Sequence, residues 1–122
     1  MMRCNMPNFR CIESSMTTIE ARDNTADVVM SSVLSNHVPQ RDIQSVLDDS
    51  FRVLRPGGRV CIGDVMMRKE MPEAVRSAIP KNCNMLMTSM TMDMYQSYMR
   101  SAGFESKYNT SPTCPGWRVI AV

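Results

Sequence analysis

Apolar positions recur along the chain in two spacings, which together predict alternating strands and helices. Residues 26–30 and 59–65 are nearly continuous apolar runs, typical of strands buried on both faces of a parallel sheet. Between these runs, apolar residues from 43 to 54 repeat at helical spacing, and Pro39 opens the segment. The residues Arg-Pro-Gly-Gly at 55–58 then end the helix, since proline cannot continue it and glycine accepts positive φ.

The remaining sequence predicts shorter elements around a long polar connection. They are, in chain order, a strand at 9–12, a short helix at 73–78, a helix from the N-cap Thr91 to Gly103, and strands at 105–110 and 117–122.

This order of elements predicts an α/β fold. A strand, a helix and a second strand in the middle of the chain require a parallel sheet with a right-handed crossover. The last two strands flank a Pro/Gly-containing turn at 111–116, which favours an antiparallel hairpin at the sheet edge. We expect a single domain over residues 1–122, because the chain is too short for two.

Composition and charge exclude several classes of function. A formal net charge of +2, with basic residues scattered along the chain, predicts no nucleic-acid partner and no membrane surface. No apolar run approaches the ~20 residues that cross a bilayer. The five cysteines are odd in number and form no CxxC pair, so we expect free thiols, no metal site and a reducing, cytoplasmic location.

Methionine is unusually frequent, with 14 in 122 residues and six between Met85 and Met99. Thioether clusters can bind a soft ion such as Cu(I). Methionine also substitutes for leucine and isoleucine as a flexible packing residue. We favour packing, because neither histidine nor a second cysteine accompanies the cluster.

Two motifs resemble the class I S-adenosylmethionine-dependent methyltransferases. In that family a D-V-V strand precedes the active-site loop, and a helix ending in R-V-L-(K/R)-P-G-G leads into the next strand. Here Asp27-Val28-Val29 and Arg52-Val53-Leu54-Arg55-Pro56-Gly57-Gly58 occur in that order, with 28 residues from Asp27 to Arg55. The later Ala102-Gly103-Phe104 also fits. The resemblance covers about residues 8 to 122 and implies the C-terminal half of a Rossmann-like sheet, with S-adenosylmethionine as cofactor.

Within this family the chain is most similar to the arsenite methyltransferases. Cys83 occupies the place of a cysteine that this subgroup carries before the helix ending in A-G-F. The resemblance implies that its thiolate holds trivalent arsenic, which is thiophilic. The subgroup has another cysteine just after the D-V-V strand, where this chain has Val33. Cys61 lies in a predicted core strand and is interpreted as a packing residue.

The family's glycine-rich cofactor loop has no counterpart in this sequence. None of the five glycines forms a GxGxG pattern, and the resemblance implies that the first two strands are absent. In the complete family sheet the fourth strand pairs with the first. Residues 26–30 are therefore expected to form an exposed apolar sheet edge, which is an association surface unless it is covered.

Four residues are candidates for contacts with the cofactor. Ser15 and Met16 occupy the place where the family carries an acidic residue near the adenine, and Ser31 and Ser32 end the predicted strand beside the path between cofactor and substrate. Serines at strand ends also cap helices and satisfy turns, so a purely structural role stays open.

Cys83 and His37 are the candidate catalytic residues. His37 lies in the loop before Pro39, where it can act as a general base near neutral pH. The alternative is a solvated surface histidine. Asp64 ends the second apolar strand and is expected to face the same rim of the sheet.

Three hypotheses follow from these features. The first is methyl transfer from S-adenosylmethionine to a small soft acceptor such as arsenite, by a truncated methyltransferase. The second is a non-catalytic half-fold that pairs with another chain, or with a second copy, through its open sheet edge. The third is a fragment with no independent function.

Overall fold

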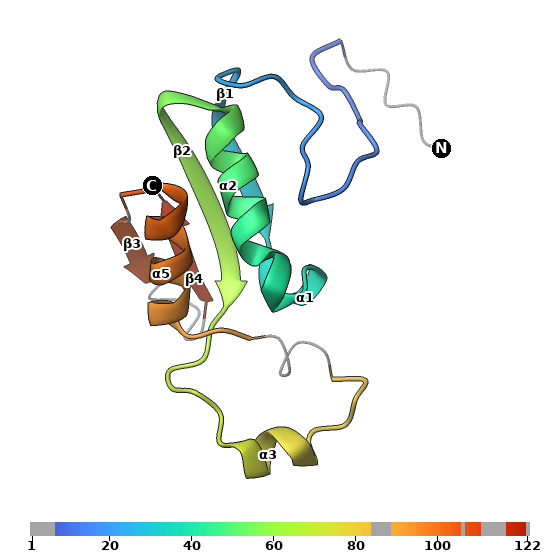
Figure 1. The fold of residues 1–122 in the computed structure, drawn as a ribbon, viewed down its shortest axis with the longest axis vertical. Coiled ribbons are helices and arrows are strands. Elements are labelled where there is room, and N and C mark those ends of the chain that lie inside the picture. Colours follow the sequence, from blue (N-terminus) through green and yellow to red (C-terminus); the bar gives the residue numbers. More distant parts are fainter. Residues whose placement is uncertain (1–6, 84–88, 106, 111–116, 122) are drawn as a thin grey trace.

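The computed structural model describes residues 7–83, 89–105, 107–110 and 117–121 (Figure 1). Their strands form one sheet in the order β1-β2-β4-β3. The strands are β1 (Ala26–Ser32), β2 (Leu54–Val65), β3 (Lys107–Thr110) and β4 (Trp117–Ala121).

The pairing of the strands gives a sheet of mixed direction. β1 and β2 run parallel, with Val29 opposite Val60. β4 pairs antiparallel with β2 on one side and with β3 on the other, so that Ile120 lies between Ile62 and Tyr108. The α/β prediction and the parallel crossover between the two apolar runs are therefore confirmed.

The helices follow the predicted spacing closely. A 3-10 turn, η1 (Gln40–Asp42), leads into α2 (Ile43–Val53), and α3 (Glu73–Ala78) and α5 (Met92–Ala102) lie where the sequence predicts them. The sequence did not predict α1 (Leu34–His37), a single turn directly after β1.

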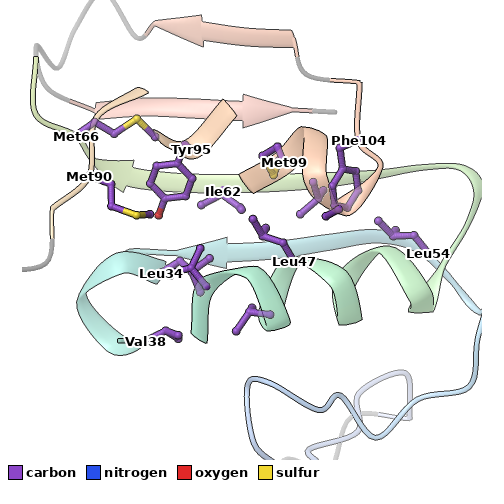
Figure 2. Packing of buried hydrophobic residues seen from close by; sticks show 14 residues of the cluster. Leu34, Val38, Leu47, Leu54, Ile62, Met66, Met90, Tyr95, Met99 and Phe104 are labelled. Atoms are coloured by element: carbon purple, nitrogen blue, oxygen red, sulfur yellow. The ribbon is translucent and has the colours of Figure 1, made fainter. Parts of the chain in front are cut away.

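The core lies between the sheet and one layer of helices, because α2 and α5 lie on the same sheet face (Figure 1). Figure 2 shows Tyr95 and Met99 of α5, together with Leu34 of α1 and Leu47 of α2, gathered around Ile62 of β2; each of these side chains is at most 1% exposed. Burying side chains of this size contributes about 1.5–3 kcal/mol each.

The opposite face of β1 is not covered by the described part of the chain. On β1, Val28 is 47% and Met30 is 77% exposed, and neighbouring Cys61 on β2 is only half-buried. The prediction that residues 26–30 are buried on both faces is therefore wrong. The apolar sequence of β1 is typical of a strand covered on both faces, but the described residues cover only one face of β1.

β1 also forms an open edge of the sheet, as the sequence predicted. Among the described strands it pairs with β2 alone, on one side. The predicted strand at 9–12 does not form, and both Phe9 (56%) and Ile12 (43%) are exposed. Strand-forming side chains do not make a strand without a partner for their backbone, and residues 9–12 pair with none of the described strands.

Arg52 holds the segment before β1 against α2. Its guanidinium donates to Asp49 at 2.6 Å, to Asp23 at 2.7 Å and to the Ile19 carbonyl at 2.9 Å. Asp49 also accepts from the backbone of Ile19. Asp49 and Arg52 therefore tie α2 to the loop that precedes β1. The hydrogen bond from Arg52 lowers the pKa of Asp49 below its ordinary value.

The two ends of α5 have distinct capping structures. Thr91 accepts from the Met94 backbone through its hydroxyl at 3.3 Å, which confirms the predicted N-cap. Gly103 has φ 102°, and its N–H donates to the Arg100 carbonyl while the N–H of Phe104 donates to Met99. This is a Schellman ending, which favours glycine.

Gly103 is also packed against α2, and this contact generates a prediction. A Cβ at this position would lie 3.0 Å from the Phe51 ring, which itself stacks edge-on against Phe104 at 5.1 Å. We expect Gly103→Ala to lower the free energy of unfolding by roughly 1–3 kcal/mol, from the left-handed backbone and the displaced ring. Urea denaturation would measure it.

Gly63→Ala is the matched control, because a Cβ there meets nothing within 4 Å and its φ is not positive. Equal losses of stability in the two variants would contradict this account of Gly103.

Candidate functional site

The candidate site lies where β1 and β2 end at the same edge of the sheet. Ligands of open α/β sheets bind at the carboxyl ends of parallel strands. Ser31 and Ser32 end β1 opposite Ile62 and Gly63 of β2, and α1 follows at once. Ser31 is half-buried and Ser32 is exposed.

Val33 turns the chain from β1 into α1 in a strained conformation. Its φ of 58° and ψ of 45° are left-handed, a region that β-branched residues rarely occupy. Its backbone N–H donates to the Gly63 carbonyl at 2.6 Å, which holds the turn against β2. Such conformations cost roughly 1–3 kcal/mol and cluster at functional sites.

Asp64 is the central residue of this rim and has no measurable exposure. Its carboxylate accepts from the Ser35 backbone at 2.8 Å, from the Ser35 hydroxyl at 2.9 Å, from the Val65 backbone at 2.8 Å and from the Tyr95 hydroxyl. Within the described ranges no basic side chain forms an ion pair with it. These hydrogen bonds offset the cost of taking the carboxylate out of water.

The Asp64 network joins three elements, because Ser35 belongs to α1, Asp64 to β2 and Tyr95 to α5. Burial, followed by the hydrogen bond and the charge of Asp64, raises the pKa of Tyr95 well above its ordinary value. Tyr95 therefore stays a neutral donor at physiological pH. The sequence predicts Asp64 at this rim, from an aspartate within an apolar strand, but neither Ser35 nor Tyr95.

The predicted cofactor-side residues lie on two separate segments. Ser15 and Met16 are exposed and lie in the loop before β1, where the Ser15 hydroxyl bonds to that of Thr17 at 2.8 Å. Ser31 and Ser32 lie on β1. No hydrogen bond joins the two pairs in the described part of the chain.

The two predicted catalytic residues lie on separate segments of the chain. His37 ends α1 and is exposed. Cys83 is a half-buried free thiol after α3, and its backbone N–H donates to the Pro80 carbonyl at 2.9 Å. No hydrogen bond connects the two side chains. Among the described residues, no group of three or more His, Cys, Asp or Glu side chains is placed to hold a metal ion.

The connection from β2 to α5 forms one wall of a cleft beyond this sheet edge. The cleft has a volume of about 490 Å³ and lies between residues 67–76, Gln40 of η1, Ser89 and Met94 of α5. None of the helices in the described ranges is long and apolar enough to span a bilayer.

Comparison with known proteins supplies the family. Residues 2–62 match the family model described as a methyltransferase domain. The chain belongs to this family. S-adenosylmethionine is the cofactor that the family implies, which agrees with the resemblance of the two sequence motifs.

Individual relatives match different lengths of the chain. The arsenite methyltransferase of Halobacterium salinarum is 36% identical over 69% of this chain and 21% of its own length. The 27-O-demethylrifamycin SV methyltransferase of Amycolatopsis mediterranei is 32% identical over 81% of this chain and 38% of its own length. The chain therefore spans well under half of each of these relatives.

Solved structures confirm the Rossmann-like fold. A Thermotoga maritima S-adenosylmethionine-dependent methyltransferase, described as a possible histamine N-methyltransferase, superimposes with a TM-score of 0.66 at 15% identity, covering 90% of this chain and 61% of its own. An arsenic(III) S-adenosylmethionine methyltransferase from Chlamydomonas reinhardtii gives 0.60 at 22% identity, covering 84% and 37%.

The residues present do not fit a complete site for the implied cofactor. No GxGxG loop exists in the sequence, and the β1 edge, where the family's first strand pairs, is open. What the chain supplies is the rim formed by α1, the end of β2 and the start of α5.

The raised pKa of Tyr95 predicts an alkaline loss of stability. Because the folded state holds the phenol neutral, its stabilising contribution is full below the unfolded pKa and is lost as pH rises towards the folded value. Between about pH 9 and about pH 11, we expect the wild type to lose about 1.4 kcal/mol more free energy of unfolding than Tyr95→Phe. Urea denaturation at both pH values would measure this.

Tyr98→Phe is the matched control, because Tyr98 is half-buried on the same helix and its hydroxyl forms no hydrogen bond with the described residues. It should keep the alkaline loss of the wild type. The same loss in Tyr95→Phe and the wild type would contradict the role assigned to Asp64 and Tyr95.

Proposed function

We propose that these residues form the acceptor-side half of an S-adenosylmethionine-dependent methyltransferase that acts on a small, soft acceptor of the arsenite type. The observation that carries the proposal is the rim locked by Asp64, at the sheet edge where this fold binds ligands. The match of residues 2–62 to the methyltransferase domain supports the reaction class.

The chemistry asks the protein mainly for positioning. Methyl transfer proceeds by in-line attack on the methyl group, so holding the acceptor at the right distance and angle supplies much of the rate. We assign the acceptor contact to the Cys83 thiolate, a soft ligand suited to trivalent arsenic. A reducing, cytoplasmic location would keep this thiol free. His37, exposed at the end of α1, is the proposed base for a proton released by the acceptor.

The cofactor side is proposed to be shared with a segment that these 122 residues do not contain. Ser15 and Met16 in the loop before β1 would contact the adenosine end, and Ser31 and Ser32 at the end of β1 would line the path between cofactor and acceptor. The amino-acid end needs a glycine-rich loop, for which the sequence has no candidate. We therefore expect the chain alone to bind S-adenosylmethionine weakly or not at all, and calorimetric titration would test this.

Methyl transfer itself is testable by supplying the missing half. The N-terminal part of the Halobacterium arsenite methyltransferase, up to its third strand, would be fused ahead of this chain. In that fusion, Cys83→Ser should lower transfer of radiolabelled methyl to arsenite by at least about tenfold, because the acceptor loses its soft ligand. Val33→Cys, which introduces the subgroup's other thiol, should raise arsenite affinity.

Cys11→Ser controls for the loss of a thiol as such, because Cys11 is exposed in the loop before β1. A fusion that binds S-adenosylmethionine yet methylates arsenite equally well with and without Cys83 would refute the assigned acceptor contact.

The open sheet edge favours a second candidate function, a non-catalytic half-fold that pairs with another chain. β1 has one unpaired edge, and the adjoining face exposes Val28 and Met30. An unprotected, apolar strand edge is a ready site for strand addition.

Association through this surface makes a distinct prediction. We expect the wild type to self-associate or to capture an added glycine-loop half in sedimentation velocity, and Met30→Lys to weaken this association because the charge would have to be buried. Val75→Lys is the matched control, since Val75 is 50% exposed on α3, away from the sheet. A wild type that stays monomeric, unfolds cooperatively and ignores the added half would exclude this function.

A further inference from the structure

The cleft beyond the sheet edge has a lining of mixed chemistry that the proposed methyl transfer does not use. Its volume of about 490 Å³ is of the size that holds a small organic ligand. Cys83, the proposed soft ligand, is not among its lining residues. The cleft is therefore a site apart from the thiol.

Three thioethers make the apolar part of the lining. Met67 and Met71 come from the chain leaving β2, and Met94 comes from the first turn of α5. All three are half-buried. Methionine side chains are flexible and polarizable, so they adapt to an unbranched apolar group. They do not indicate a metal here, because no histidine or cysteine lines the cleft with them.

The polar part of the lining carries both signs of charge. Glu70 and Glu73, both exposed, are its acidic residues, and the half-buried Arg76 is its basic residue. Arg76 and Glu73 form only a loose ion pair, with 4.0 Å between Nε and Oε2. At this separation the guanidinium keeps its donors, and the carboxylates keep their lone pairs, for a ligand.

We propose that this cleft binds a small zwitterionic α-amino acid with an unbranched apolar side chain. Its ammonium pairs with Glu70 and Glu73, its carboxylate pairs with Arg76, and its side chain lies on the thioethers. A ligand with only a negative charge meets two carboxylates, and one with only a positive charge meets the guanidinium. A zwitterion can pair with the carboxylates and with the guanidinium at the same time.

Three probes that differ by one group each test this assignment without any cofactor. L-norleucine carries both charges, n-pentylamine lacks the carboxylate, and hexanoate lacks the ammonium. Affinities would be measured by saturation-transfer NMR on the complete chain. We expect norleucine to bind about fivefold more tightly than either single-charge probe, which is the effect expected of one solvent-accessible ion pair.

Two variants connect this preference to the cleft. Arg76→Gln should remove the advantage of norleucine over pentylamine, because norleucine loses the partner of its carboxylate and the pentylammonium no longer meets a like charge. Arg100 is an exposed arginine of α5 outside the lining, so Arg100→Gln should change neither the affinity for norleucine nor the affinity for pentylamine. Circular dichroism would confirm that both variants keep their helices.

Equal affinity for norleucine and pentylamine, the same effect from both arginine variants, or no norleucine binding at about 20 mM would each overturn the proposal. Because the assay contains neither S-adenosylmethionine nor arsenite, its outcome is independent of whether the chain supports methyl transfer.

Discussion

A buried carboxylate that forms no ion pair with the described residues governs the shape of the candidate site. Asp64 has no exposed surface, and its burial is tolerable only while Ser35, Tyr95 and the Val65 backbone keep donating to it. Each donor fixes the element that carries it. The first turn of α1 and the first turn of α5 are thereby held at set positions over the end of β2, although they are far apart in sequence.

This constraint explains why the chain tolerates a strained residue beside it. Val33 lies two residues before Ser35 and adopts a left-handed conformation that valine disfavours. Its N–H donates to the Gly63 carbonyl, and the N–H of Ser35 donates to Asp64. These two hydrogen bonds fix the backbone on both sides of the strained residue. The rim therefore combines local strain with rigid support, an arrangement that is typical of binding sites.

Local patterns predicted most of the elements, because helix spacing, caps and apolar runs depend on nearby residues. The Thr91 cap and the glycine ending at 103 are such cases. The failures depend on distant partners: residues 9–12 have strand formers but no strand to pair with, and Val28 and Met30 are apolar but uncovered. The Asp64 network was likewise beyond reach, since no spacing rule brings together positions 35, 64 and 95.

The rim and β1 differ in how far their polar groups are paired and their apolar side chains are buried. At the rim, every buried polar side-chain atom of the described residues has a hydrogen-bond partner, and the charged cleft adjoins the start of α5. At β1, one strand edge pairs with none of the described strands, and Met30 is exposed. A surface of that kind is costly to leave open. Among the described residues, the satisfied polar network therefore lies at the rim, whereas the exposed apolar surface lies at β1.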